Sequence, residues 1–378
     1  MICRTLERGS GLTGRTFQTP ILWLGQNLRN RILLAHHREL RSAPLIVSLG
    51  DAFQRPSFHD RFFTEQLREN LNMDGPIMVD SGGYALLARR SLRCSIRQIS
   101  KIYERLDADI LVSLDHPPSP GDDRVVRSRL RRRTLHNLDL LRHTVAPERL
   151  MPVVHGHTLS EIERSCEDIR RLCPDARQVG VGGLVPLLQS GGAFRGFRYN
   201  RSDGTSGDRG TWIADTLSVL RQYFPQALIH VFGIGSATTA IGALALGADS
   251  ADSLSWRRVA NYGAILLPGR SERFPVYRKH RVPSRPVLTE EDIPLLLSCR
   301  CPVCTSFPQL EKRLQALSSC YKRRAIHNAW TLLSEVASFR AAIQRCNVPE
   351  FLESRLTARH LLYKPVMATI HSSSSSLQ

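Results

Sequence analysis

The sequence predicts an α/β protein built as a (β/α)8 TIM barrel with a C-terminal helical subdomain. Short apolar runs that end in polar residues or glycine recur through the first 265 residues, and stretches with helical periodicity separate them. Continuous apolar strands that alternate with helices are typical of a parallel sheet covered on both faces. The number of repeats favours a closed barrel over an open doubly wound sheet, which is the alternative.

The predicted strands end at residues that can carry chemistry. The apolar runs are Leu45–Ser48, Ile77–Asp80, Ile110–Asp115, Pro152–His155, Val179–Gly183 and Ile229–Gly233. Asp80, Asp115, His155, Gly182–Gly183 and Gly233 therefore stand at carboxyl ends of strands, the rim where barrel enzymes place catalytic groups. Aspartate and glycine also start loops, so each residue alone has a structural interpretation. Their recurrence along the chain favours a functional site.

Downstream of the barrel the composition changes. A Pro- and Arg-rich connector occupies 270–286, a cysteine cluster follows, and 310–362 carries apolar residues at helical spacing. We expect a TIM-barrel domain over 1–269 and a helical subdomain over 270–365 that completes the barrel surface. A disordered tail is expected over 366–378, because its serine-rich end has nothing to bury.

The chain is strongly basic. It contains 52 Lys and Arg residues against 34 Asp and Glu residues, a formal net charge of +18. This balance favours a polyanionic partner, because nucleic-acid binding depends largely on phosphate neutralisation. The densest basic run, Arg124–Arg133, is predicted to start a helix after Asp123. It is interpreted either as a phosphate track or as the solvated face of that helix.

Cysteine usage and the N-terminal residues predict the compartment. Nine cysteines are an odd number scattered over a long chain, unlike a secreted disulfide framework. The N-terminus lacks the apolar region of a signal peptide, and no uninterrupted apolar run of about 18 residues is present. We therefore expect a cytoplasmic protein with no membrane partner.

Three thiols stand close together at Cys299, Cys301 and Cys304, and His327 follows at the start of a helical stretch. Three thiolates and one imidazole form a tetrahedral structural zinc site that is closed to substrate. The alternative is a set of free cysteines near an unrelated histidine. A C-x-C-x2-C pattern in a reducing compartment has few other uses, so structural Zn²⁺ is the expected cofactor.

Two other segments contain carboxylates. Asp80 at a strand end precedes Gly82–Gly83, a glycine pair that lets the backbone approach a ligand closely. Asp249 and Asp252 stand three residues apart after an apolar stretch. One of this second pair is interpreted as a nucleophile, and the other as a helix cap or a structural acid.

Taken in order, these motifs resemble those of the tRNA-guanine transglycosylase superfamily. The segments that carry the resemblance are DSGGY at 80–84, SLDHP at 113–117, VVHG at 153–156, VGGLVP at 181–186, FGIG at 232–235, GADSADS at 247–253 and the cysteine motif with His327. A weaker similarity, through 252–257 and 266–270, links the chain to the bacterial DNA 7-deazaguanine transglycosylases called DpdA.

The resemblance implies base exchange by double displacement. Asp252 matches the family nucleophile, which attacks C1′ and expels guanine to leave a covalent glycosyl-enzyme. Asp80 matches the aspartate that protonates the departing purine and then deprotonates the incoming base. Asp115 matches the carboxylate that reads the purine N1–H and exocyclic amine. The alternative for Asp115 is a loop cap before His116.

Further residues are assigned to substrate binding by the same resemblance. Gly183 and Leu184 match backbone positions that contact the edge of the base, and Tyr84 lies where an aromatic ring can stack on the purine. His155 and Gly233 are expected to line the same site. His155 is a departure, because bacterial tRNA enzymes have glutamine there.

A second departure concerns the incoming base. Bacterial tRNA enzymes have a glutamate, which receives an aminomethyl group, where this chain runs Val185-Pro186-Leu187. Its absence implies an uncharged nitrile base, preQ0, and archaeal relatives that use preQ0 also have Val-Pro here.

A third departure concerns the polymer. The Pro-Thr-Arg segment that grips the anticodon loop in the family is replaced around Trp256, Arg257 and Arg258. DNA is therefore the favoured substrate, with these three side chains holding a flipped nucleotide.

The leading hypothesis is a DNA-guanine transglycosylase that inserts preQ0 into DNA, together with partner proteins of a modification and restriction system. The close alternative is a tRNA-guanine transglycosylase in queuosine- or archaeosine-type modification. A more distant alternative is a non-catalytic family member that binds nucleic acid or a catalytic partner. The presence of both Asp80 and Asp252 argues against that third hypothesis.

Overall fold

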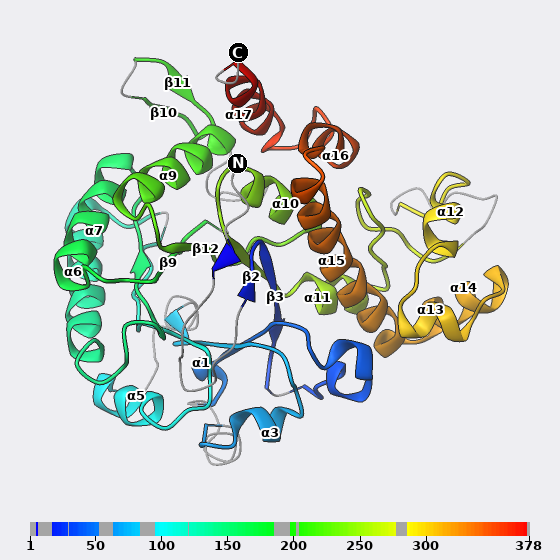
Figure 1. Cartoon of the computed structure of the whole chain (residues 1–378), viewed down its shortest axis with the longest axis horizontal. Coiled ribbons are helices and arrows are strands. Elements are labelled where there is room, and N and C mark those ends of the chain that lie inside the picture. The colour runs from blue at the N-terminus through cyan, green and yellow to red at the C-terminus, as the bar shows by residue number, and fades with distance from the viewer. Residues whose placement is uncertain are drawn as a thin grey trace.

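The computed structural model describes residues 5–6, 17–28, 30–52, 63–83, 95–119, 121–184, 197–201, 204–276 and 286–375. Over these ranges the predicted TIM barrel is confirmed, because a nine-stranded parallel sheet curls into a barrel with helices around it (Figure 1). Its strand order is β7-β6-β5-β4-β3-β13-β12-β9-β8.

Pro152 explains why nine strands make an eight-fold barrel. Proline has no N–H to give to a ladder, so it interrupts a strand. Here it separates β7 (Leu150–Met151) from β8 (Val153–Val154). β7 pairs with β6, and β8 pairs with β9. These two consecutive segments of chain join the two ends of the sheet and close the barrel.

Each of the six predicted apolar runs overlaps a barrel strand, and the other three strands, β3, β7 and β13, were not predicted. The strands around the barrel besides β7 and β8 are β3 (Ile21–Gln26), β4 (Leu45–Ser48), β5 (Ile77–Asp80), β6 (Ile110–Val112), β9 (Gln178–Val181), β12 (Leu228–Val231) and β13 (Ser250–Ser253). Two short antiparallel ribbons pair β1 (Thr5–Leu6) with β2 (Phe17–Gln18) and β10 (Tyr199–Asn200) with β11 (Ser206–Gly207).

Alternation of side chains along the strands builds two apolar layers. Ile21 and Trp23 of β3, Met78 of β5 and Ile110 and Val112 of β6 belong to the cluster that fills the barrel interior. Their neighbours in sequence point outward and join the larger core beneath the helices. Successive side chains of a strand face opposite sides of the sheet, so a strand covered on both faces is apolar throughout.

Helices surround the barrel (Figure 1). The longer ones are α5 (Ile96–Tyr103), α6 (Arg124–Leu141), α7 (Leu159–Leu172), α9 (Arg209–Tyr223), α10 (Ala237–Ala245), α11 (Ser255–Asn261) and α15 (Tyr321–Gln344). The start of α6 follows the prediction, since the Asp123 side chain accepts a hydrogen bond from the Val126 N–H at 2.8 Å. Short helical turns between β3 and β5 are η1 (Leu34–His36), η2 (Arg38–Leu40), α1 (Leu49–Ala52) and α3 (Leu67–Leu71).

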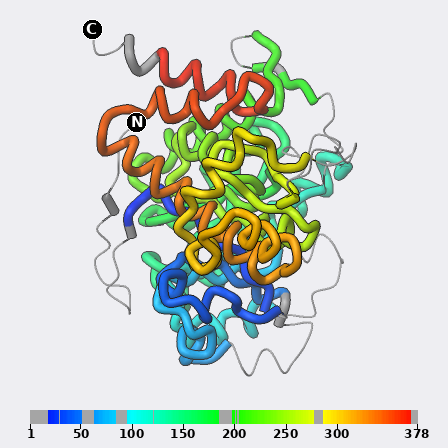
Figure 2. Tube along the Cα trace, turned by 90° about the vertical axis from the view of Figure 1, so that its right-hand side faces the viewer, coloured from blue at the N-terminus to red at the C-terminus, as the bar shows by residue number. Residues whose placement is uncertain are grey.

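The C-terminal segment lies against one side of the barrel, as the yellow and orange tube in Figure 2 shows. It contains α12 (Asp292–Leu297), α13 (Pro302–Ser306), α14 (Leu310–Ser319), α15, α16 (Val348–Arg355) and α17 (Tyr363–Ser375). α15 contacts α11, α10 and β3. The division at residue 269 into two domains stays a prediction.

The expectation of a disordered tail from residue 366 is wrong for most of its length. α17 continues to Ser375, and Val366 is fully buried. The apolar residues before the serine run supply the contact that the composition of the run alone does not reveal. None of the helices in the described ranges has the length and apolar character needed to cross a membrane.

Candidate active site and metal centre

Asp80 ends β5 and accepts hydrogen bonds from two neighbours. The Ser48 hydroxyl, which ends the adjacent β4, donates to Asp80 Oδ2 at 2.8 Å, and the Gly82 N–H donates to the same oxygen at 3.1 Å. Ser48 and Asp80 are partners in the β4–β5 register. The barrel ladder itself therefore sets the position of the carboxylate at the rim.

Asp115 and His155 form a buried pair between the ends of β6 and β8. His155 Nε2 lies 2.7 Å from Asp115 Oδ2, and the Ser81 hydroxyl lies 3.4 Å from Oδ1. Gly83 is required beside them, because a Cβ at this residue would lie 1.9 Å from Asp115 Oδ1. The predicted glycine pair thus makes room for a protein carboxylate.

One nitrogen of His155 is left over for a ligand. The His155 side chain is 6% exposed, and within the described part of the chain its Nδ1 has no hydrogen-bond partner. Gly182 lies against the ring, since a Cβ there would come within 2.4 Å of His155 Cε1. Buried polar atoms are normally paired, and an unpaired one costs roughly 1–3 kcal/mol. A polar ligand bound beside Asp115 would give this nitrogen a partner.

Asp252 lies in β13 with its carboxylate oriented by a backbone donor. The Gly233 N–H, just beyond β12, donates to Asp252 Oδ1 at 2.7 Å. His230 Nε2 lies 3.4 Å from the same oxygen, close enough for an ion pair when the ring is protonated but not aligned as a hydrogen bond. The other ring nitrogen, Nδ1, lies 2.8 Å from Ser250 Oγ. The carboxylate is thereby fixed while part of it stays accessible.

The two candidate acids in this segment have different surroundings. Asp249 is buried, and its Oδ2 accepts from Arg221 Nη2 at 2.6 Å and from the Ile229 N–H at 2.8 Å. It therefore links α9 to β12 at the amino end of the strands. Asp252 stands toward the opposite end of β13. These contacts give Asp249 the surroundings of a structural acid, and the nucleophile role of Asp252 stays a prediction.

The carboxylates at the rim interact electrostatically. The pKa of Asp80 is raised from 3.8 to about 7, first by burial and then by the negative charges of Asp115 and Asp252. The hydrogen bonds from Ser48 and Gly82 oppose this change. A carboxyl group with a pKa near neutrality can both donate and accept a proton at physiological pH.

Replacing Asp80 with asparagine is expected to change the pH dependence of stability. Because its pKa is higher in the folded chain than in the unfolded chain, this group contributes stability below about pH 4 that is lost as the pH rises through about 7. Asp80→Asn should therefore reduce the fall in melting temperature between about pH 5 and about pH 8. Thermal unfolding of Asp74→Asn, an exposed carboxylate, is the control. Equal falls in wild type and Asp80→Asn would contradict the raised pKa.

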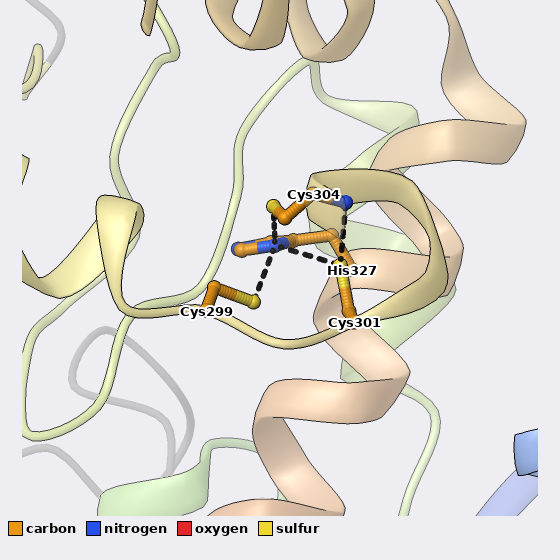
Figure 3. Close-up of side chains that lie close together, drawn as sticks. All are labelled: Cys299, Cys301, Cys304 and His327. Carbon is orange, nitrogen blue, oxygen red and sulfur yellow. Dashed lines mark hydrogen bonds between the residues drawn. The ribbon is translucent and has the colours of Figure 1, made fainter. Parts of the chain in front are cut away.

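Figure 3 shows the second cluster, in which Cys299, Cys301, Cys304 and His327 converge. The three sulfur atoms lie 3.5, 3.6 and 3.4 Å from His327 Nδ1, and all four ligand atoms lie within 4.8 Å of one another. With bonds of about 2.3 Å to sulfur and 2.0 Å to nitrogen, a tetrahedral zinc ion places sulfur and nitrogen about 3.5 Å apart. The donor set and its spacing therefore fit zinc.

Local structure prepares the cluster for a metal. Cys301 caps α13, and its sulfur accepts the Cys304 N–H at 3.2 Å. His327 Nε2 lies 2.9 Å from the Leu266 carbonyl oxygen, which accepts its proton and leaves Nδ1 free to face the thiols. Such a carbonyl partner fixes the tautomer and the ring orientation of a metal-binding histidine. The next residue, Asn328, accepts from the Leu266 N–H at 2.7 Å and donates to the carbonyls of Trp256 and Ala264.

The family model described as "Queuine tRNA-ribosyltransferase" (TGT) matches residues 11–360. The chain belongs to this queuine tRNA-ribosyltransferase family. The resemblance inferred from the motifs is thereby confirmed at the level of the superfamily, whereas the link to the DNA-modifying branch stays a suspicion.

Curated relatives of the chain are named tRNA-guanine(15) transglycosylase. The protein from Pyrococcus furiosus is 22% identical over 357 residues, which cover 93% of this chain and 54% of the relative. The protein from Archaeoglobus fulgidus is 26% identical over 299 residues, covering 76% and 53%. That from Methanosarcina mazei is 24% identical over 333 residues, covering 86% and 60%. The chain spans about half the length of these relatives.

Trp256 and Arg257 do not lie where the sequence analysis places them. Trp256 is fully buried in α11, and its indole N–H donates to the Gly25 carbonyl at 2.9 Å. Arg257 is 6% exposed, and its Cζ lies 4.7 Å from the centroid of the Trp256 ring. Its guanidinium donates a hydrogen bond to the Arg31 carbonyl oxygen. Both side chains attach α11 to the barrel, so neither is available to hold a nucleotide. Arg258 is exposed, and its contact with nucleic acid stays a prediction.

Of the remaining predicted site residues, three lie in the described part of the chain and the others do not. Gly183 has a φ of 78° and lies at the end of β9, followed by the fully buried Leu184, and their contact with the base stays a prediction. Gly233 serves the site through Asp252. Tyr84 and the segment 185–187 lie outside the described residues.

Sequence reasoning missed three residues of the candidate site. The Ser48 hydroxyl donates to Asp80, and the Ser81 hydroxyl donates to Asp115. The third residue, His230, lies close to Asp252. Of these, only His230 had a usable signal, since it is a titratable residue in the middle of an otherwise apolar strand.

Proposed function

We propose that this chain exchanges guanine in tRNA for a 7-deazaguanine base, as a pentosyltransferase that forms a covalent intermediate on Asp252. The observation that carries the proposal is the arrangement at the rim. The oriented, accessible carboxylate of Asp252 stands at the same rim as Asp80, whose pKa of about 7 suits acid–base work. Membership of the family and the names of the relatives support the same activity.

The chemistry uses the two carboxylates in turn. An Asp252 oxygen attacks C1′ of the target nucleotide, the C1′–N9 bond breaks, and its electron pair leaves with guanine. Asp80, in its protonated form, gives its proton to the departing purine. The ionised Asp80 then takes the N9 proton of the incoming base, whose N9 attacks C1′ and releases the Asp252 carboxylate. Both aspartates return to their starting states, so no other reactant is needed.

Asp115 and His155 would hold the base. A carboxylate accepts hydrogen bonds from the N1–H and the exocyclic amine of guanine, which preQ0 also carries. The unpaired Nδ1 of His155 supplies one more polar contact at the same place. The choice of preQ0 as the incoming base rests on residues 185–187 and stays a prediction from sequence.

The polymer is proposed to be tRNA rather than DNA. The expectation of DNA rested on the replacement of the family's anticodon-gripping segment and on a weaker similarity to the DNA-modifying branch. Trp256, Arg257 and Arg258 were expected to hold the flipped nucleotide, and the burial of the first two removes that clamp. The three relatives above are named for tRNA, and all three span more than three quarters of this chain. DNA therefore enters as a competing substrate in the assay.

The test supplies labelled preQ0 with unfractionated tRNA and, in parallel, with duplex DNA, and measures label in each polymer. Incorporation into tRNA that depends on Asp252 is the expected result. Label confined to DNA would contradict the choice of polymer while leaving the assigned aspartates in place. No label in either polymer, with zinc bound and the chain folded, would contradict the proposed activity.

A further inference from the structure

A basic cavity adjoins the Asp115–His155 pair. It has a volume of about 400 Å³ and lies between α6 and α7, which are side by side at the left of Figure 1. Among the described residues, Glu161 is the single carboxylate in its lining, and the arginines there are Arg124, Arg127, Arg131 and Arg164. A concave surface with this balance attracts an anion.

The position of the arginines on α6 decides between the two interpretations of the basic run. Arg124, Arg127 and Arg131 recur at helical spacing and share the face toward α7, where all three line the cavity. Arg129 and Arg132 are exposed and do not line it. One half of the run therefore forms a concave basic surface, and the other half is solvated.

Two of the four arginines are held in place and two are available. Arg127 pairs with Glu161 at 2.9 Å, and Arg131 pairs with Asp168 at 2.8 Å, so these contacts tie α6 to α7. Arg124 and Arg164 are exposed and have no ion pair or hydrogen bond to another described side chain. Arg127 and Arg131 therefore form a fixed part of the cavity lining. Arg124 and Arg164 can bind an anion without breaking an ion pair.

Three other features of the lining favour an anion linked to the base site. Thr158 caps the N-terminus of α7 at the cavity, and Ser160 adds a hydroxyl there. The N-terminus of a helix favours negative charge. His155, which holds Asp115 through Nε2, also lines the cavity and so places the cavity directly beside the base site.

We infer that this cavity binds a backbone phosphate of the tRNA, beside the nucleotide whose base Asp115 reads. The inference rests on the proposed function, since it takes the polymer and the position of the base from there. A free anion would satisfy the arginines equally well. Because the cavity adjoins the Asp115–His155 pair, a phosphate of the same polymer is favoured over a free anion.

The test compares two doubly substituted proteins by fluorescence anisotropy with labelled unfractionated tRNA. Arg124→Gln with Arg164→Gln should weaken binding about tenfold and lower the slope of log affinity against log salt by about one to two. The matched control, Arg129→Gln with Arg171→Gln, removes the same charge from the same helices outside the cavity. It should change affinity much less.

Two further measurements make the result specific. Arg124→Lys with Arg164→Lys keeps the charges and should restore most of the affinity, because a lysine also binds phosphate as a point charge. Calorimetric titration with preQ0 alone should give the same affinity in wild type and in the glutamine double variant, which shows that the base site is intact.

Equal weakening by the cavity pair and the control pair would overturn the inference, and so would a loss seen with duplex DNA but not with tRNA. Wild-type protein that binds no tRNA would overturn both this inference and the choice of tRNA. Normal tRNA modification with an unaltered salt slope in the cavity variant would overturn the phosphate site alone.

Discussion

Replacing Asp252 with asparagine is expected to abolish base exchange and covalent trapping of the nucleotide. The amide oxygen can still accept the Gly233 N–H, so the geometry of the rim survives. The amide has no carboxylate charge with which to attack C1′. Loss of a nucleophile from a cooperating site costs about four to six orders of magnitude in rate. Exchange of labelled base and a denaturing gel for the covalent adduct would measure both effects.

Asp249→Asn is the matched control, because it changes the other carboxylate of the same segment. Its contacts to Arg221 and Ile229 are structural, so the melting temperature should fall while folded protein still forms the adduct. Turnover retained in Asp252→Asn would remove Asp252 from its assigned role. An adduct lost in Asp249→Asn but kept in Asp252→Asn would exchange the two assignments.

Replacing Cys301 with serine is expected to lower bound zinc well below one ion per chain and to destabilise the fold. Cys301 is fully buried, caps α13 and faces His327, so its loss removes a ligand and leaves three donors. Loss of a structural metal ranks among the largest single-substitution effects, about 4 kcal/mol or more. Elemental analysis would measure the metal, and thermal unfolding would measure stability.

Cys346→Ser serves as the control, since this thiol is exposed and lies outside the cluster. It should keep full zinc content and the wild-type melting temperature. Full metal occupancy in Cys301→Ser would show that the cluster is not the metal site. Low zinc in both variants would instead point to a global effect of removing thiols.

The barrel strands were predictable where both faces of a strand are buried, because the sequence is then apolar throughout. Strands covered on both faces need continuous apolar runs, and β4 and β5 have the predicted bounds. β13 has the sequence Ser-Ala-Asp-Ser, whose small and polar residues give no apolar signal. Its strand conformation depends on pairing with β3 and β12, which local sequence does not encode. The strand that carries Asp252 was therefore missed although Asp252 itself was named.

The site was predictable as residue types but not as contacts. Motif order located Asp80, Asp115 and Asp252, whereas the pairing of His155 with Asp115 depends on how β6 and β8 end beside each other. For Trp256 the sequence suggested a contact that the structure does not contain. An aromatic next to arginines suggests a nucleic-acid surface, but the helical phase of α11 turns Trp256 and Arg257 inward and leaves Arg258 outside. Phase relative to the barrel is a tertiary property.

The contacts of His327 and Asn328 with the segment around Leu266 link the Cys3His cluster to the chain just after β13, the strand that carries Asp252. A ribosome that has delivered β13 and α11 has still to make more than sixty residues before these two side chains emerge. Until then the peptide groups of Ala264 and Leu266 lack the partners they have in the finished fold. The segment that follows the Asp252 strand therefore obtains these hydrogen-bond partners only late in synthesis.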